Sequence, residues 1–290
     1  MRNFWISLFW IAITAVSLPA QSGYEITVWV EDFDESEAYM AQYYGTRPYL
    51  MDTTQRNAEG AFVFSDTSEL EAGMYFLVFP PKKDFLQIMV NEKEQHFTIY
   101  TTAGDWDDSA RFDRSEDNRL FREYLAFIRQ KEAERKQVRD SLKDMGAEPS
   151  LIKEELKKLD QQVDAYKYKV YRQFPHTVTG TMLHADLETP LPQFSEGTEE
   201  EISMQQFYFK RAHYLDSVDL ADERLLRTPI LEKKVNFLID RMTVQRADSL
   251  TIALDRILTG AESHPENFQY FFVKFLNEYG QSNTLGFDKI

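Results

Sequence analysis

The sequence has no cysteine among its 290 residues. This absence excludes a thiol nucleophile, a CxxC redox pair and cysteine-ligated zinc, because each of these needs a cysteine sulfur. It also excludes a lipoprotein, whose lipid is attached to an N-terminal cysteine. We therefore expect a protein that cannot carry out thiol–disulfide exchange by itself and that has no disulfide to stabilise its fold.

Basic residues are scarce relative to acidic ones. The chain has 33 Lys and Arg against 48 Asp and Glu, which gives a formal net charge of -15. A strongly acidic surface repels phosphate backbones, so we expect no nucleic-acid partner. The remaining composition, 43% hydrophobic and 28% charged, is that of a globular protein of about two domains.

Long hydrophobic runs are absent except at the N-terminus. Residues 4–18 are mostly apolar, and they lie between a short start containing Arg2 and the dipeptide Pro19-Ala20. This is the pattern of a secretory signal peptide, and the run is short for a membrane span. We expect cleavage after Ala20, with an uncleaved anchor as the alternative. Cleavage leaves 32 basic and 48 acidic residues, a net charge of -16, on a periplasmic chain that is not an integral membrane protein.

Alternating apolar and polar residues predict a β-sandwich domain over residues 23–102. In 24–31, Tyr24, Ile26, Val28 and Val30 share one face of a strand. Further strands are predicted at 38–44, 48–52, 61–65, 74–79, 85–90 and 96–101. Turn residues separate them at short intervals, which favours an antiparallel sandwich without crossover helices.

Helical periodicity begins after a predicted linker at 103–114 and continues over residues 115–290. The segments 116–145 and 151–174 are broken at Gly146 to Pro149, which predicts a long antiparallel helical hairpin. This hairpin is either an ordinary packed pair or a docking arm for a partner. Shorter helices are predicted at 199–217, from Thr228, at 248–258 and from His264 to Gly280. The predicted fold class is thus α+β in two segregated parts.

Several short motifs carry a resemblance to a known family. In the strand region these are residues 51–54 (MDTT), 59–64 (EGAFVF) and 72–75 (AGMY); in the helical region they are 115–121 (SEDNRLF), 222–229 (DERLLRTP), 268–271 (FQYF) and 286–288 (GFD). Together they resemble the β-domain and helical region, both of unknown function, that precede the thioredoxin domain in envelope thiol-disulfide oxidoreductases of the TlpA/ResA type.

The resemblance implies a function without catalysis. In such proteins a thioredoxin domain with a CxxC pair follows the helical region, and this chain has no counterpart of that pair. No catalytic residue can therefore be transferred, and no cofactor is expected. The chain corresponds either to a stand-alone module or to a truncated oxidoreductase, and a thioredoxin-like protein is the implied partner.

One acidic run after residue 101 has the spacing of a calcium loop. Oxygen-bearing side chains occupy positions 1, 3, 5, 9 and 12 of that template, at Asp105, Asp107, Ser109, Asp113 and Glu116. The sixth position, where the turn needs glycine, is Ala110. The alternative is a linker in which Asp113 caps the following helix and Glu116 completes a capping box.

Two other residue sets are candidates for binding. Aromatic residues of the strand region could stack on a sugar or grip a peptide, or could simply pack: Trp29, Tyr39, Tyr43, Tyr44 and Tyr49. His176 and His184 lie eight residues apart, but no histidine pair has the spacing of a known metal motif.

Three functions remain after this reading. The first is a non-catalytic exported envelope module that acts as an interaction or accessory protein. The second is a glycan- or peptide-binding module, through the aromatic residues or the cleft between domains. The third is a hydrolase without a recognisable motif.

Overall fold

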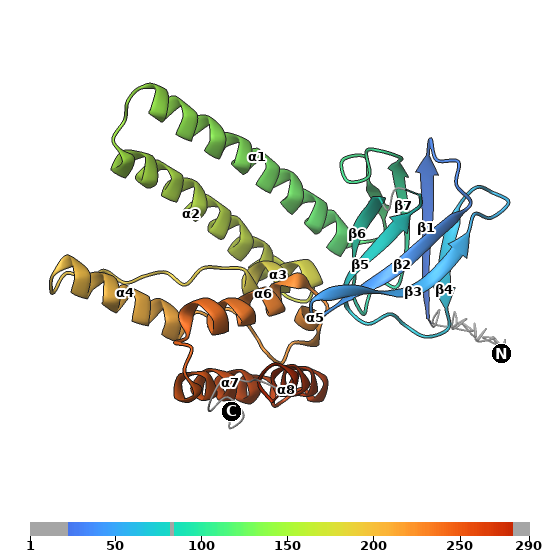
Figure 1. Ribbon diagram of the computed structural model, residues 1–290. Helices are drawn as coiled ribbons and strands as arrows, with labels where there is room; N and C mark the ends of the chain where they lie inside the picture. Colours follow the sequence, from blue (N-terminus) through green and yellow to red (C-terminus); the bar gives the residue numbers. More distant parts are fainter. Residues whose placement is uncertain (1–22, 82–83, 281–290) are drawn as a thin grey trace, which may run out of the picture.

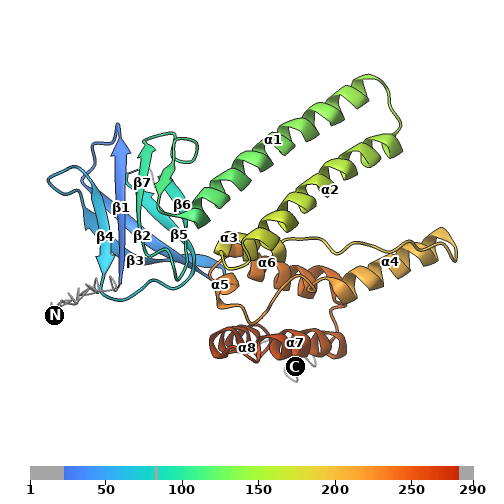
Figure 2. The same cartoon turned by 180° about the vertical axis from the view of Figure 1, so that it is seen from behind.

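The computed structural model describes residues 23–81 and 84–280 and divides into a β-sandwich and a helical part (Figure 1). Two helices leave the sandwich as a projecting hairpin, and most of the other helices pack below its root. Figure 2 shows the same arrangement from behind. The predicted fold class, α+β in two parts, is confirmed. The predicted signal peptide, residues 1–20, and residues 284–290 lie outside the described ranges.

The first sheet has four strands in the spatial order β4-β1-β7-β8. They are β1 (Tyr24–Glu31), β4 (Phe62–Asp66), β7 (His96–Thr102) and β8 (Arg111–Asp113). β1 and β7 are parallel, so the prediction of a purely antiparallel sandwich is wrong at this pair. After β6 the chain crosses from the second sheet to the first. β7 then runs beside β1 in the same direction.

The second sheet is antiparallel throughout, with the order β3-β2-β5-β6. Its strands are β2 (Glu37–Tyr44), β3 (Arg47–Gln55), β5 (Gly73–Phe79) and β6 (Asp84–Val90). The apolar face of β1 that the sequence predicted is buried against this sheet, with Ile26 and Val28 fully enclosed. Strand alternation thus places the sandwich core between the sheets.

Residues 103–114, predicted as a linker, are packed on the sandwich. They contain β8, which pairs with β7, and Trp106 stacks on Phe79 with ring centroids 4.4 Å apart. The Trp106 indole N–H donates to the Asp84 carboxylate at 3.1 Å. These contacts make the segment a part of the sandwich, which the short, polar sequence around Trp106 did not indicate.

The helical part contains eight α-helices and one π-helical turn within the described residues. They are α1 (Glu116–Asp144), α2 (Pro149–Gln173), α3 (Val178–Ala185), α4 (Glu199–His213), α5 (Glu223–Leu226), α6 (Pro229–Phe237), η1 (Leu238–Met242), α7 (Ala247–Ala261) and α8 (Pro265–Tyr279). None of the helices in 23–81 and 84–280 is long and apolar enough to cross a membrane.

α1 and α2 form the predicted antiparallel hairpin. The rings of Phe127 and Tyr166 stack at 4.1 Å in its inner part, and farther out Lys131 donates to Gln162 at 2.8 Å. No residue from 122 to 166 is buried. Since most helical stability comes from packing an apolar face on a core, this long stretch is held mainly by its own pairing and its root.

The first turn of α1 is capped differently from the prediction. Ser115, not Asp113, is the N-cap residue, and its hydroxyl accepts from the Asn118 backbone N–H at 3.3 Å. The role expected of Glu116 belongs to Glu94 in the β6–β7 turn, whose carboxylate accepts from the Glu116 and Asp117 backbone N–H groups, each at 3.1 Å. The helix start is therefore fixed by the sandwich.

Candidate functional site

The buried guanidinium of Arg227 joins the two parts of the molecule. It donates to Glu71 of the sandwich at 2.6 Å and to Glu266 of α8 at 2.8 Å, and only 1% of its side chain is exposed. Its carbonyl accepts from the Met74 backbone N–H at 2.8 Å. A Cβ at Gly73 would lie 2.4 Å from the Arg227 Cβ, so this close approach requires glycine. The glycine of the AGMY motif thus has an interdomain role.

The charges around Arg227 keep it ionised. Burial lowers the pKa of the guanidinium, but the carboxylates of Glu266 and Glu71 outweigh that effect, so the pKa is raised. Arg227 also lies over the Tyr44 ring, 5.9 Å from its centroid. The joint is therefore a permanent ion-pair network that spans both parts.

A second joint surrounds Asp117, which is completely buried in the first turn of α1. Its carboxylate accepts from the Val178 and Thr179 backbone N–H groups at the start of α3, at 2.7 and 2.9 Å. It also accepts from the Asn91 side chain of the sandwich at 3.0 Å. One carboxylate thus ties together α1, α3 and the turn that follows β6.

The neighbouring Asn118 continues this joint along the edge of β6. Its side-chain amide accepts from the Met89 backbone N–H at 2.8 Å and donates to the Met89 carbonyl at 2.6 Å. The Asn118 amide therefore makes the two hydrogen bonds to the Met89 backbone that a neighbouring β-strand would make. Together the two joints hold the helical part in a fixed position against the sandwich.

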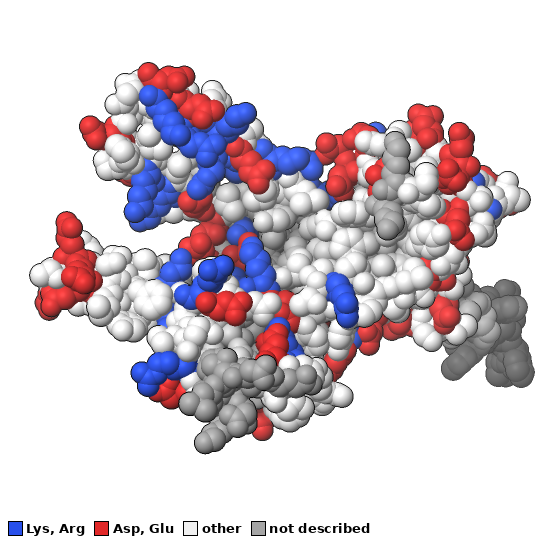
Figure 3. Space-filling view, viewed as in Figure 1, with Lys and Arg blue, Asp and Glu red and all other residues white. Residues whose placement is uncertain are grey.

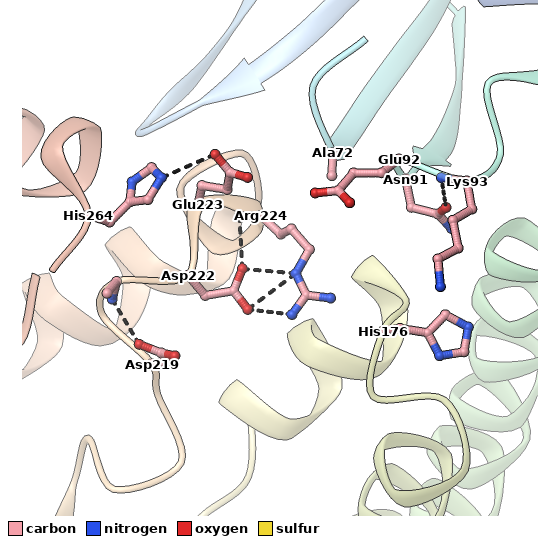
Figure 4. A pocket seen from close by; sticks show the side chains of 11 residues that line it. Ala72, Asn91, Glu92, Lys93, His176, Asp219, Asp222, Glu223, Arg224 and His264 are labelled. Atoms are coloured by element: carbon pink, nitrogen blue, oxygen red, sulfur yellow. Dashed lines mark hydrogen bonds and ion pairs between the residues drawn. The ribbon is translucent and has the colours of Figure 1, made fainter. Parts of the chain in front are cut away.

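A pocket of about 430 Å³ opens between the two parts, beside these joints (Figure 4). Five separate segments line it: Ala72, residues 91–93, His176, residues 219 and 221–224, and His264. Asn91, which donates to Asp117, lies in its wall, and so does Glu223, whose backbone carbonyl accepts from the Arg227 guanidinium at 3.2 Å. Because both joints border it, the pocket is preformed.

The floor of the pocket carries a paired arginine. Arg224 forms a fork with Asp222 through bonds of 2.9 and 2.6 Å. Burial lowers the pKa of Arg224, but the hydrogen bonds and charge of Asp222 outweigh this, so the pKa is raised. The pair is therefore ionised and largely neutralises itself.

Within the described ranges, one group of three acidic or imidazole side chains is close enough to share a metal ion. It consists of Glu223, His264 and Glu266. His264 Nε2 lies 3.2 Å from Glu223. Glu266, however, holds the guanidinium of Arg227 with both oxygens, at 3.0 and 2.8 Å. A divalent cation here would be repelled by that guanidinium, so the arrangement is better explained as part of the Arg227 joint.

The chemistry that the pocket offers is polar binding. Among the described residues that line it, none is a serine, threonine or aromatic residue. The imidazole of His264 is paired with Glu223 and has no hydroxyl beside it in the lining, unlike a nucleophile–base arrangement. The side chains that reach into the space are charged, and they suit a ligand with charges of its own.

A second feature is the pair of projecting arms formed by α1–α2 and α4 (Figures 1 and 2). α4 has no buried residue along its fifteen positions. It exposes apolar side chains instead: 50% of Met204, 45% of Phe207 and 57% of Tyr208 are accessible. Phe209 on its other side contacts Phe194 of the preceding segment, with centroids 6.0 Å apart. Exposed apolar side chains in such a row are typical of surfaces that bind proteins.

Charge is distributed unevenly over the same parts. Lys and Arg gather on the hairpin, whereas Asp and Glu dominate the visible face of the sandwich (Figure 3). Residues 116–173 contain 14 basic and 12 acidic residues, and the rest of the chain contains 19 basic and 36 acidic residues. The hairpin is thus slightly positive on a strongly negative protein.

The structure does not gather the five residues of the calcium template into one site. Ser109 is turned inward, since its hydroxyl accepts from the Thr102 backbone N–H at 2.9 Å. Asp107 pairs with Arg122, Asp113 lies in β8, and Glu116 is in the first turn of α1. Asp105 and Asp107 do border one shallow pocket with Asp84 and Asp108.

The five aromatic residues are likewise divided between surfaces. Tyr43 and Tyr44 pack against the core of the helical part, and the Tyr44 ring lies 5.6 Å from that of Tyr270 on α8. Tyr49 is 46% exposed on β3. Trp29 and Tyr39 lie on β1 and β2, in different sheets. They therefore do not form one continuous ligand face.

The two histidines of the middle segment also face different spaces. His176 lines the interdomain pocket, whereas His184 stacks on Tyr171 at 3.9 Å. Burial lowers the pKa of His184, partly opposed by its hydrogen bond to Ser217. The pair is not among the metal-compatible groups of the described ranges.

Sequence reasoning missed most of the interdomain pocket. The motif at 222–229 does contain Asp222, Glu223 and Arg224, and it was noticed only as a resemblance. Nothing in the sequence indicated that residues 91–93 lie opposite them, because these segments are more than a hundred residues apart. The charged triplet Glu92-Lys93-Glu94 reads as an ordinary turn.

The comparisons with known proteins bear on the helical part alone. Residues 153–283 match a family described as a domain of unknown function (DUF5106). This range begins in α2 and extends past α8, and it contains the pocket residues from His176 to His264 but not those of the sandwich. No curated protein matches the chain.

Proposed function

We propose that the chain is an exported, non-catalytic module of the cell envelope that acts as an interaction or accessory protein. The N-terminal leader pattern supports export, and the motifs that resemble those of envelope oxidoreductases support a thioredoxin-like partner. The chain has no cysteine, so it would recruit or position redox chemistry carried by another protein.

The observation that carries this proposal is α4. This fifteen-residue helix has no buried residue, and its contact with Phe194 through Phe209 leaves Met204, Phe207 and Tyr208 exposed. Isolated helices of this length are marginal in water, even with a capping box such as that formed by Thr198 and Glu201. Contact with a partner through Met204, Phe207 and Tyr208 would cover this apolar surface and stabilise the helix.

The hairpin supports the same function. None of its 45 consecutive residues 122–166 is buried, although Tyr124, Leu125 and Tyr166 near the root pack against the core. Its surplus of basic residues contrasts with the acidic remainder of the chain. A partner that touches both arms would meet a slightly positive helix pair and an apolar helix, and complementary charge would speed and orient its approach.

Site-specific photo-cross-linking in the native cell tests this proposal. A photoreactive phenylalanine analogue replaces Tyr208 on α4, and the matched control places it at Tyr100 on β7, which is 49% exposed. We expect a covalent adduct with a thioredoxin-like envelope protein from position 208 and none from position 100. The adduct should disappear when Phe207 is changed to glutamate in the same chain.

Two results would overturn the proposal. One is an equal yield of the same adducts from both positions, which would indicate random collision. The other is a full-length chain that retains its leader and stays in the cytosolic fraction. Reduction of a disulfide substrate by the purified chain would contradict the non-catalytic role.

A further inference from the structure

We propose that the interdomain pocket binds a short peptide in its zwitterionic form. The peptide's free carboxylate would lie at the end formed by Lys93 and His176. Its free ammonium would lie at the end where the carboxylates of Glu92 and Glu223 stand. This inference is independent of the arms that carry the proposed function.

The first step concerns which charges of the pocket are already paired. Asp222 and Arg224 neutralise each other, and a carboxylate oxygen of Glu223 lies 3.2 Å from His264 Nε2. In the described part of the chain, the ammonium of Lys93 and the ring of His176 have no hydrogen bond or ion pair. An ammonium and an imidazole that have no partner within the chain are available to a ligand at little reorganisation cost.

The second step concerns how the opposite charges are arranged. In Figure 4 the Lys93 side chain points toward His176, whereas the carboxylate of Glu92 points toward Glu223 and Arg224. Asp219 accepts from the Ala221 backbone N–H at 3.0 Å and lies beyond Asp222, away from Glu92. The pocket therefore has a cationic end and an anionic end, which match a molecule that is negative at one end and positive at the other.

The third step concerns the size and chemistry of the ligand. A cavity of about 430 Å³ falls within the range of roughly 300–1,000 Å³ that small-molecule sites occupy. A neutral sugar has no charges to match the separated charges of the pocket, and the lining has no tryptophan, tyrosine or phenylalanine on which a sugar ring would stack. A peptide of two or three residues has both the length and the terminal charges.

Calorimetric titration of the purified mature chain tests the proposal. The probe is dialanine in four forms: free, N-acetylated, C-amidated, and blocked at both ends. We expect the free form to bind in the millimolar range or tighter, each single block to weaken binding at least fivefold, and the doubly blocked form to bind weakest. Equal binding of all four forms, or no binding of free dialanine, would overturn the proposal.

A pair of lysine variants assigns the carboxylate end. Lys93→Met should weaken binding of free dialanine at least fivefold while leaving binding of the C-amidated form unchanged, because that form has no carboxylate for Lys93 to contact. The matched control is Lys157→Met, at an exposed lysine of α2, which should change neither. An equal loss of affinity for free and for C-amidated dialanine would show that Lys93 does not contact the carboxylate. Both variants replace exposed side chains, and their melting temperatures should equal that of the parent.

Discussion

Asp117 shows how a single residue can organise the contact between the two parts. Its carboxylate is fully enclosed and accepts three hydrogen bonds, two from the start of α3 and one from Asn91. A buried carboxylate is costly unless donors surround it, and here the donors come from separate elements. The residue therefore makes the position of α3 dependent on that of the sandwich.

Replacing this carboxylate by an amide should be strongly destabilising. In Asp117→Asn one oxygen becomes an NH₂ group that faces backbone donors of Val178 or Thr179, so a buried hydrogen bond is lost and two donors oppose each other. We expect a loss of about 2–4 kcal/mol in the free energy of unfolding, measured by urea denaturation. The control is Glu116→Gln at the adjacent, exposed position, which should change stability by less than about 0.5 kcal/mol.

The residue scale is also where sequence reasoning reached least far. Ser115, Asn118 and Phe121 belong to a motif noticed for its resemblance, yet their roles as cap, strand-like pair and core residue need the β6 edge and the core beside them. Glu94 replaces Glu116 as the acid at the helix start because it reaches there through space. Local sequence patterns cannot predict such roles when the interacting residues are far apart along the chain.

At the scale of elements, local pattern predicted most of the structure. β1 and the hairpin helices begin and end within two residues of the expected bounds. Apolar and polar residues alternate regularly in β1, and apolar residues recur every three or four positions in α1 and α2. α3 was missed because its residues are buried on nearly every side, so it has no polar face to give a helical period. The parallel pairing of β1 with β7 was missed because it joins strands about seventy residues apart.

The hairpin provides a prediction at this scale. Removing residues 136–142 and 152–158 together shortens both helices by about two turns and keeps their facing sides in register. No buried residue is lost, so we expect the melting temperature to change by less than about 3 °C.

Circular dichroism on heating measures the melting temperature of the shortened chain. A matched deletion of seven residues from α8, 268–274, removes Phe271 from the core and should unfold the helical part. A large destabilisation by the hairpin deletion itself would show that the distal arm packs on something within the chain.

At the scale of the molecule, the core of the helical part extends into the sandwich, which also has a core of its own between its sheets. The hydrophobic cluster of the helical part includes Ala72, Met74 and Met89 of the sandwich. The Arg227 and Asp117 networks cross the same boundary. Interfaces of this kind couple the stability of the elements that form them.

Calorimetry should therefore record one unfolding transition for the whole chain. We expect a single heat-capacity peak whose calorimetric and van't Hoff enthalpies agree, since unfolding of the helical part would uncover Ala72, Met74 and Met89 and would break both networks. Arg227→Met should lower the temperature of that peak, because Glu71 and Glu266 lose their shared cation. Two peaks in the parent protein would contradict this coupling of the two parts.

The length of the hairpin sets a fixed distance in the molecule. α1 has 29 residues, which at about 1.5 Å per residue gives a rod of roughly 43 Å from its root to its tip. Because Asp117 and Asn118 clamp that root beside the pocket, the tip stands at a constant reach from it. A molecule bound at the hairpin tip and a molecule bound in the pocket would therefore be separated by a distance that the length of α1 sets.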